Sequence, residues 1–272
     1  RVHLKFGLLR ACSIRNATSA TNESVCAMFP MVAPSHLIVP GTLTVLTGYA
    51  NQGKSTLLNS IIAHALRWHF PVCVASFETD VKPILRDGLR MALLQCGKHD
   101  LAHADMSEVD ALLADRLSII SQIVDEDREM DLDHFLSLAR IAVIRHGAKM
   151  IVLDPWNEIE HKRRRDESET EYIGRALRQI KHFARKHDVA FWVIAHPSKP
   201  MQGFKGAPGL YDISGSAHWA NKPEYGLAYH RKNFDSNEAD IIVNKVRMGL
   251  PGKKGSVAVR YDFRTSTFEQ CI

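Results

Sequence analysis

Short apolar runs alternate along the chain with longer segments whose apolar residues recur every three or four positions. The short runs are typical of buried strands, and the helical spacing is typical of amphipathic helices. Strands are expected at residues 43–47, 72–77, 117–120, 150–153 and 190–194. Helices are expected at 54–68, 81–96, 131–146 and from about 168 onward. Strands that alternate with helices in this order predict an α/β fold with a mainly parallel sheet flanked by helices.

Two further patterns complete the predicted fold. Ser168 and Glu171 have the spacing of a capping box, so a helix is expected to begin there. After residue 203 the chain changes to strand-like runs at 225–230, 239–246 and 256–261, which predict antiparallel C-terminal strands extending the same sheet. We interpret residues 1–35 as an N-terminal arm or linker remnant, and residues 36–272 as one domain.

Composition limits the classes of protein that fit this pattern. The 272 residues are 45% hydrophobic and 24% charged, which suffices for one large globular domain with a full core. No apolar run approaches the ~20 residues of a membrane span, so no membrane partner is expected. The chain begins at Arg1 without an initiator Met or a secretory signal, and we interpret it as a domain of a longer protein.

Cysteine usage and charge bear on the compartment and the partners. The five cysteines are scattered without a C-x-x-C pair, which favours a reducing compartment over a disulfide framework or a zinc site. We therefore expect a cytoplasmic location, with an organellar matrix left open. The net charge of +5 is compatible with a nucleic-acid partner but does not establish one.

A phosphate-binding motif lies between the first predicted strand and the first predicted helix. Residues 48–55 match the pattern G-x-x-x-x-G-K-[ST], whose glycines let the backbone curve so that its N–H groups point at phosphate oxygens. Lys54 is expected to reach the β- and γ-phosphates of ATP or another nucleoside triphosphate, and the Ser55 hydroxyl to ligate Mg²⁺. The expected nucleotide-binding residues here are Gly48, Ala50, Asn51, Gln52, Gly53, Lys54, Ser55 and Thr56.

Three residues at the ends of predicted strands are candidates for chemistry at the phosphates. Asp154 ends an apolar strand and is expected to hold the metal through water, together with Ser55. Glu78 follows another strand, where a carboxylate either orients the attacking water or faces solvent. His196 follows a third strand, where it either senses the γ-phosphate or caps the strand. The residues themselves leave both pairs of alternatives open.

An ordered set of segments resembles the DnaB-like replicative helicases, a family that includes phage primase-helicases and the mitochondrial Twinkle helicase. The resemblance runs from about Pro40 to Glu269 and implies a RecA-like P-loop NTPase core. It also implies an ATP-hydrolysing motor that translocates on single-stranded DNA. The segments that carry it are 40–45, 76–78, 153–157, 194–197, 214–217 and 244–249.

The resemblance implies a role for each candidate at the phosphates. Glu78 is similar to the glutamate that activates the hydrolytic water, and Asp154 to the Walker B aspartate. His196 occupies the position of the polar sensor that links the γ-phosphate to the DNA-contacting loops.

Four more residues have roles implied by the resemblance. Lys245 and Arg247, two positions apart on one strand face, are similar to the finger that enters the site of the neighbouring subunit. The alternative from the residues is a solvated strand face. Arg231 and Tyr261 are similar to the pair that stacks on the nucleotide base.

A finger supplied by a neighbour requires a closed ring, by resemblance a hexamer, with single-stranded DNA passing through its centre. Lys199 and Lys205 lie in a Gly/Pro-rich loop and are expected to contact DNA phosphates. The basic run 161–165 is a weaker candidate. A primase or loader is expected on a separate chain or on a missing domain.

Three other functions compete with the helicase interpretation. A RecA/RadA-like DNA-dependent ATPase shares the fold but does not separate strands, and the 214–217 and 245–247 segments disfavour it. A small-molecule kinase requires an Arg-rich lid, for which only residues 163–165 are candidates. A non-catalytic nucleotide switch is disfavoured by the intact set of Lys54, Ser55, Glu78 and Asp154.

Replacing the phosphate-loop lysine tests the nucleotide site. Lys54→Ala is expected to abolish both nucleotide-dependent thermal stabilisation and turnover, because the loop loses its phosphate-binding cation. Thermal unfolding with and without Mg-ATP provides the measurement. Unchanged binding by the variant would contradict the phosphate-site interpretation.

Overall fold

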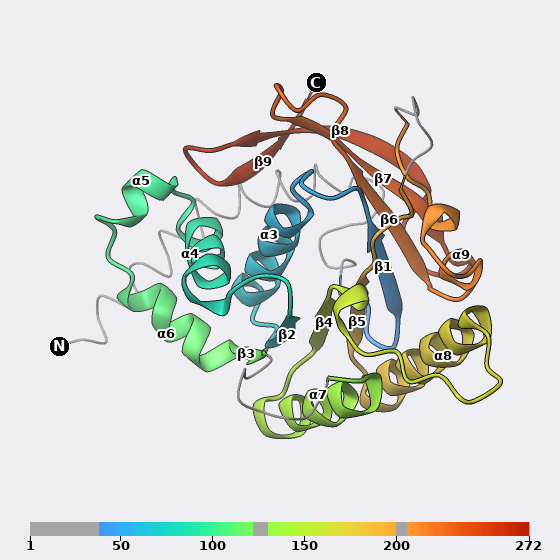
Figure 1. The fold of residues 1–272 in the computed structure, drawn as a ribbon. Coiled ribbons are helices and arrows are strands. Elements are labelled where there is room, and N and C mark those ends of the chain that lie inside the picture. Colours follow the sequence, from blue (N-terminus) through green and yellow to red (C-terminus); the bar gives the residue numbers. More distant parts are fainter. Residues whose placement is uncertain (1–37, 122–129, 200–205, 272) are drawn as a thin grey trace.

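A computed structural model describes residues 38–121, 130–199 and 206–271. The expected N-terminal arm, residues 1–35, lies outside the described residues. The described chain forms a nine-stranded sheet with helices on both faces (Figure 1). The strands are β1 (Leu43–Thr47), β2 (Val72–Ser76), β3 (Leu117–Ile120), β4 (Met150–Asp154), β5 (Ala190–Ile194), β6 (Tyr225–His230), β7 (Glu238–Val246), β8 (Gly255–Asp262) and β9 (Thr267–Gln270). The helices are α3 (Lys54–Arg67), α4 (Arg86–Leu94), α5 (Lys98–Leu101), α6 (Ser107–Arg116), α7 (Leu132–His146), α8 (Glu169–His187) and α9 (His218–Asn221).

The strand order is β3-β2-β4-β5-β1-β6-β7-β8-β9. All pairs from β3 to β6 are parallel, and β6 through β9 pair antiparallel. The antiparallel strands, orange to red in Figure 1, curve away from the parallel part of the sheet. This arrangement confirms the predicted α/β class with an antiparallel C-terminal extension.

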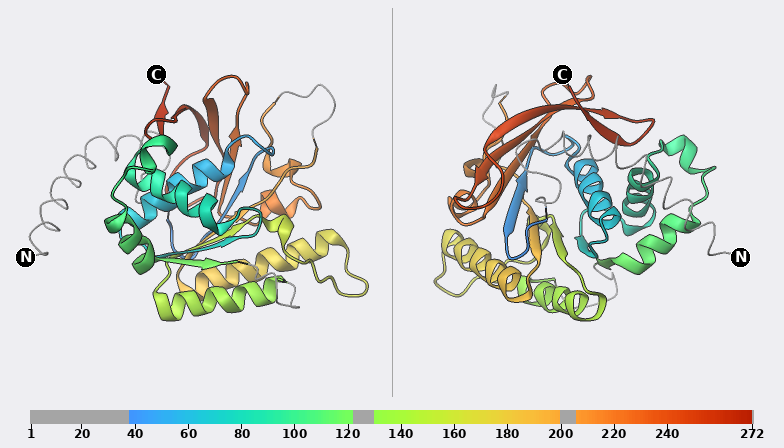
Figure 2. Two further views of the ribbon diagram at one scale, coloured as in Figure 1. Left: turned by 60° about the vertical axis from the view of Figure 1, so that its left-hand side comes forward. Right: turned by 180° about the vertical axis from the view of Figure 1, so that it is seen from behind.

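Alternation along the parallel strands divides the core between two faces of the sheet. In β1, Leu46 faces one buried cluster, whereas Leu43 and Val45 face the other. The first cluster includes apolar residues of α3 and α4, and the second includes those of α7 and α8. Figure 2 shows these two helical layers on opposite faces of the sheet. Since both faces are covered, the strands read as nearly continuous apolar runs.

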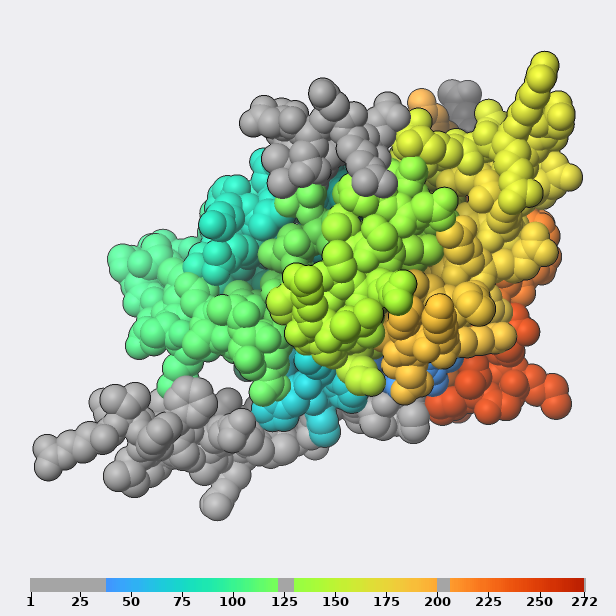
Figure 3. All heavy atoms as spheres, turned by 90° about the horizontal axis from the view of Figure 1, so that it is seen from below, coloured from blue at the N-terminus to red at the C-terminus, as the bar shows by residue number. Residues whose placement is uncertain are grey.

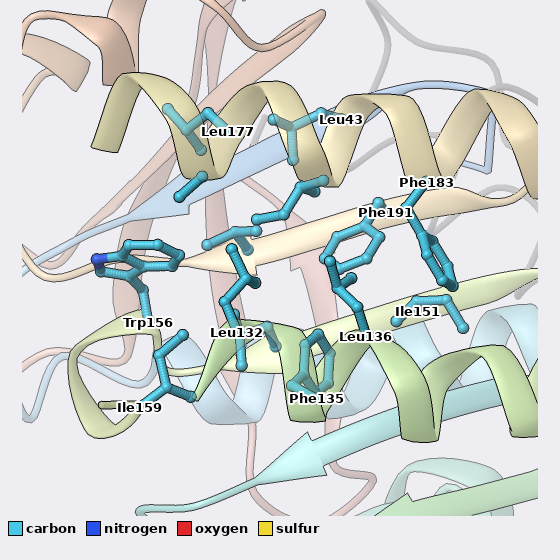
Figure 4. Packing of buried hydrophobic residues seen from close by; sticks show 14 of the residues in the cluster. Leu43, Leu132, Phe135, Leu136, Ile151, Trp156, Ile159, Leu177, Phe183 and Phe191 are labelled. Carbon is cyan, nitrogen blue, oxygen red and sulfur yellow. The ribbon is translucent and has the colours of Figure 1, made fainter. Parts of the chain in front are cut away.

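The second cluster is built around aromatic side chains that meet edge to face. Phe191 of β5 lies between Phe135 of α7 and Phe183 of α8, with both pairs of ring centroids 6.0 Å apart and both interplanar angles 85° (Figure 4). Phe135 and Phe191 have no exposed surface. The two helices lie side by side, as the lime and gold surfaces of Figure 3 show, and both contribute residues to this cluster.

Local signals explain where the two outer helices begin. Ser168 caps α8, and the reciprocal bonds with Glu171 form the predicted capping box. Asp131 caps α7 by accepting a 2.8 Å hydrogen bond from the backbone N–H of His134. Gly147, with φ of 66°, ends α7 in the left-handed conformation that glycine adopts at low cost.

The predicted helix 81–96 is wrong at its first turn. Residues 81–85 form one turn of π-helix, within which Lys82 has extended φ and ψ of −127° and 126°. Lys82 precedes Pro83, and a residue before proline is sterically disfavoured in the helical region. The regular helix α4 therefore begins only at Arg86. The helices α5 and α6 and the strand β9 were not predicted.

Truncating the central aromatic side chain of α7 tests how far the second cluster stabilises the fold. Phe135→Ala is expected to lower the free energy of unfolding by about 3–5 kcal/mol, because it leaves a cavity beside Phe191. Ile144→Ala on the same helix is the matched control, since that side chain is 65% exposed. Urea unfolding of both variants gives the two values. Similar losses in the two would contradict this assignment of the core.

Candidate functional site

The strand order brings the predicted phosphate-site residues to one edge of the sheet. Strands β2, β4, β5 and β1 are neighbours and parallel, so their carboxyl ends meet at the same edge. Glu78 follows β2, Asp154 ends β4, His196 follows β5, and residues 48–53 follow β1. Ligands of open α/β sheets bind at this edge of the parallel strands.

The phosphate loop adopts a conformation that depends on its glycines. Gly53 has φ of 102° and precedes α3, and a side chain there would be strained. A Cβ on Gly48 would lie 2.5 Å from the carbonyl oxygen of Tyr229 and 3.1 Å from Lys54 Cδ. Asn51 also has positive φ, 60°. The loop is therefore packed closely against β6 and against the stem of its own lysine.

Lys54 lies in the first position of α3 and is 7% exposed. Its Nζ donates a 2.7 Å hydrogen bond to the carbonyl oxygen of Tyr49, across the mouth of the loop. Burial lowers the pKa of this lysine, and the carboxylates of Glu78 and Asp154 oppose that shift. The amino group is thus held among the groups where a phosphate would bind.

Asp154 and Ser55 present hard oxygen atoms suited to magnesium. Burial, together with the nearby Glu78, raises the pKa of Asp154 to about 6, although Lys54 opposes this shift. A divalent cation beside this carboxyl would relieve that unfavourable charge. The Ser55 hydroxyl lies in the first turn of α3 and is exposed. The donor set fits a Mg²⁺ ion that completes its shell with phosphate oxygens and water.

His196 and Glu78 face each other across the site. His196 Nε2 lies 3.5 Å from Glu78 Oε2, and the Glu78 side chain is 60% exposed. Burial lowers the pKa of His196, with Lys54 adding to the effect and Glu78 opposing it. The Nδ1 atom is buried and has no hydrogen-bond partner among the described residues. An imidazole with an unpaired nitrogen can hydrogen-bond an incoming polar ligand.

The predicted base-stacking residues lie beside the phosphate loop. The Gln52 side chain exchanges two 3.3 Å hydrogen bonds with the backbone N–H and carbonyl of Arg231. The Arg231 guanidinium donates 2.7 Å bonds to the carbonyls of Ser236 and Phe234, which fix its plane. Arg231 and Tyr261 line one small pocket together with Gln52, Gly53 and Thr56.

A larger pocket of about 580 Å³ opens on the other side of the loop. It joins the phosphate loop to the segments that follow β5 and β6. Its lining includes Tyr49, Ala50, Gln52, His196, Lys199 and Phe234. The two pockets share Gln52 and Arg231, so a nucleotide-sized ligand would have space on both sides of this linked pair.

Lys245 and Arg247 do not join the other predicted site residues. They lie at the end of β7, which pairs with the beginning of β6 and so reaches the opposite edge of the sheet. Lys245 Nζ donates to the carbonyls of Ala220 and Asn221 at 2.6 and 2.8 Å, and Arg247 donates to that of Lys222 at 3.1 Å. The five residues of β1 alone separate the two edges by roughly 16 Å.

Of the predicted DNA contacts, Lys199 is exposed and Lys205 lies outside the described residues. The basic residues 161–165 are exposed as well. Lys162 pairs with Asp131 at 2.9 Å and with Glu160 at 3.0 Å, so part of this run is engaged within the chain.

Two connections in and around the site were missed from sequence. Asn157 Oδ1 accepts a 3.1 Å hydrogen bond from the backbone N–H of His196, which links the segment after β4 to the one after β5. Gln52 ties the phosphate loop to β6, as described above. Both depend on which strands are neighbours, and no local pattern in the sequence gives that.

Comparisons with known proteins agree with this architecture. The model of the AAA domain family matches residues 33–202. The chain is 35% identical over 255 residues to the Arabidopsis thaliana Twinkle homolog protein, chloroplastic/mitochondrial, covering 85% of this chain and 34% of that protein. The chain therefore spans about a third of the length of this curated relative.

Two solved structures share the fold. The ATPase domain of G40P superposes with a TM-score of 0.66 at 14% identity, covering 85% of both chains. A DnaB-like replicative helicase, described with its interactions with primase, superposes with a TM-score of 0.69 at 15% identity. That match covers 89% of this chain and 62% of the other.

The RecA-like sheet and the phosphate loop at its edge define a P-loop NTPase. The family model places the chain more narrowly: it belongs to the AAA domain family. It is also similar in sequence to the Twinkle homolog and shares its fold with a DnaB-like helicase. The predicted resemblance is thereby confirmed.

No group of three or more His, Cys, Asp or Glu side chains within the described residues is arranged to hold a metal ion. None of the helices in residues 38–121, 130–199 and 206–271 has both the length and the apolar character to cross a bilayer.

The raised pKa of Asp154 predicts a pH-dependent stability. Between pH about 4 and 6 the folded chain keeps a proton that the unfolded chain releases, so stability falls as pH rises through this window. Asp154→Asn removes the effect. Without nucleotide or magnesium, it should be stabilising at pH 7 by on the order of 2 kcal/mol and nearly neutral at pH 4.

Urea unfolding of wild type and Asp154→Asn from pH 4 to 8 measures this difference. Glu158→Gln is the control, since its exposed side chain lies in the turn after β4. A difference between wild type and Asp154→Asn that stays constant with pH would contradict the assigned charge.

Proposed function

We propose that this chain is the motor domain of an ATP-dependent replicative DNA helicase. In this proposal it hydrolyses ATP with Mg²⁺ and moves along single-stranded DNA as a ring of identical subunits, by family resemblance a hexamer. The observation that carries the proposal is the separation of Arg247 from the phosphate loop. Both belong to one chain, yet they occupy opposite edges of its sheet.

The chemistry at the phosphates is assigned to residues already close together. Lys54 binds the β- and γ-phosphates and leaves the carbonyl of Tyr49 when it does so. Glu78, more than half exposed, orients the attacking water and accepts its proton. Ser55 and Asp154 would hold a magnesium ion, whose charge would offset that of the phosphates. His196 detects the γ-phosphate beside Glu78 and passes this state to the exposed segment around Lys199.

The nucleotide base is assigned to the small pocket between Arg231 and Tyr261. The guanidinium of Arg231 is held flat by two carbonyls, and Tyr261 lies in β8 with Phe263 and Phe268 at 4.9 Å. A base stacked there would leave its triphosphate pointing along the loop toward Lys54. The bond between Gln52 and Arg231 would keep the two parts of the site in register.

Arg247 completes the site of a neighbouring subunit in this proposal, with Lys245 beside it. A cation supplied in trans stabilises transition-state charge and is worth roughly 10³–10⁵ in rate in other NTPases. A head-to-tail contact of this kind closes into a ring when its rotation permits. The DNA would pass through the centre, near Lys199 and Lys205, and be held through its phosphates.

The relatives and the cysteines support a proposal on partners and compartment. A primase or loader is proposed as a further partner, since the DnaB-like neighbour is described together with primase. Cys73, Cys96 and Cys271 are free thiols, which suits a reducing compartment such as the cytoplasm or an organellar matrix. The Twinkle homolog is named for chloroplasts and mitochondria.

ATP hydrolysis by the purified chain, over a range of protein concentrations and with or without single-stranded DNA, tests this proposal first. Turnover per chain is expected to rise steeply with concentration and with DNA, because complete sites form only between subunits. Unwinding of a forked duplex separates this function from that of a RecA/RadA-like ATPase. Turnover indifferent to both concentration and DNA would argue against a ring motor.

Mixing two inactive variants tests the sharing of sites. Glu78→Gln should bind ATP but lose turnover by orders of magnitude, and Arg247→Ala should bind ATP normally and also lose turnover. The Arg247→Ala chain keeps an intact phosphate site. In a mixture, some of these sites receive the intact Arg247 of a neighbouring Glu78→Gln chain, so activity should partly return. No recovery, with each variant inactive alone, would contradict catalysis in trans.

A further inference from the structure

Glu224 is a buried carboxylate at the edge of the sheet opposite the phosphate loop. Its side chain is 5% exposed and immediately precedes β6. One oxygen, Oε1, lies 2.6 Å from Lys181 Nζ, 3.4 Å from Arg185 and 3.5 Å from Arg247 Nε. The other, Oε2, accepts a 3.1 Å hydrogen bond from the backbone N–H of Leu43. One carboxylate thus joins α8, β1 and the end of β7.

Burying an unpaired carboxylate costs free energy, so Glu224 can be buried only because cations surround it. The cations in turn depend on Glu224, because it is the anion that lies among them. Burial, together with the nearby Arg247 and Lys181, lowers the pKa of Lys245 to about 8, and Glu224 opposes this shift. Without the carboxylate, Lys181, Lys245 and Arg247 would repel one another.

The backbone strengthens the same connection. The N–H of Glu224 donates to the carbonyl of Leu43, and the N–H of Arg247 donates to the carbonyl of Glu224, both at 2.9 Å. Leu43 begins β1, the strand that leads directly into the phosphate loop. Arg247 Nη2 donates to the carbonyl of Lys222 at 3.1 Å, but the side chain is still 44% exposed, so part of the guanidinium faces the surface where a neighbour would bind.

We propose that Glu224 is a positioning residue that holds Arg247 in the orientation needed to enter the neighbouring subunit's site. Its carboxylate forms an ion pair with Arg247 Nε and is itself held by the backbone of β1 and by Lys181 of α8. Leu43, which binds the same carboxylate, begins the strand that leads into the subunit's own phosphate loop. Glu224 therefore connects that strand to the arginine that serves the next site. The inference rests on the proposed function, since it assigns a support to the arginine that acts in trans.

Steady-state ATP hydrolysis at saturating DNA tests the assignment with two variants. Glu224→Gln removes the charge, and Glu224→Asp keeps it but shortens its reach, so a usable variant remains if the first folds poorly. Each is expected to lower kcat about tenfold or more with KM for ATP within about twofold, because the nucleotide contacts lie at the other edge. Glu238→Gln is the matched control; that exposed β7 carboxylate pairs with Arg260 at 2.6 Å and should leave kcat unchanged.

Rescue in trans separates positioning from a general structural defect. Mixed with Glu78→Gln chains, Glu224→Gln or Glu224→Asp chains should regain activity to the extent that Arg247→Ala chains do. Their own phosphate sites are intact and would be served by a correctly held Arg247. A structural defect in the phosphate site would not be rescued, and that result would overturn the inference.

Turnover of Arg247→Ala distinguishes a failure of the proposed trans role of Arg247 from a failure of the positioning role of Glu224. If Arg247→Ala keeps wild-type turnover, the trans role in the proposed function fails, and Glu224 has nothing to position. If Arg247→Ala loses turnover while both Glu224 variants keep theirs, the inference about Glu224 alone is overturned. Loss in all three, with equal rescue, supports both.

Discussion

The parallel pairing of β1 with β5 and β6 is the constraint on which this molecule depends. It places the phosphate loop between the segments that follow β5 and β6. The hydroxyl of Thr47 donates a 2.8 Å hydrogen bond to the carbonyl of Ala195, so the last residue of β1 is fixed to the chain just before His196. A shift of this register by one residue would turn every β1 side chain toward the wrong core and carry the loop away from its partners.

The ionisable groups at the carboxyl edge of the sheet are buried in a way that disfavours their charged forms, which lowers the stability of the nucleotide-free chain. Asp154 has a raised pKa, Lys54 a lowered one and His196 a lowered one, each mainly because of burial. In the proposed function, a magnesium-bound triphosphate would supply the charges that this arrangement lacks. Perturbed pKa values of this kind are common where proteins keep groups ready for a ligand rather than for their own stability.

Sequence patterns predicted much of this structure, and the limits have physical causes. The strands β1 and β5 were predicted residue for residue because they are buried along their whole length, and the capping box fixed the beginning of α8 at Ser168. The kink near Lys82 was missed because Pro83 was not weighed against the helical pattern. The phosphate loop was recognisable because its functional residues follow one another in a single segment of the sequence. The surroundings of Glu224 were not, because its partners lie from 23 positions (247 − 224, Arg247) to 181 positions (Leu43) away along the chain and meet only in the folded structure.

The position of Arg247 at the edge of the sheet opposite the phosphate loop gives each chain two different ends. One end offers a phosphate site and the other offers a cation, so copies that share sites must stack in one sense. An open stack then always has one more chain than it has complete sites, and the deficit matters most when the stack is short. Closure removes the deficit, since the last chain then serves the first. A closed assembly would thus contain more complete sites than an open one with the same number of chains.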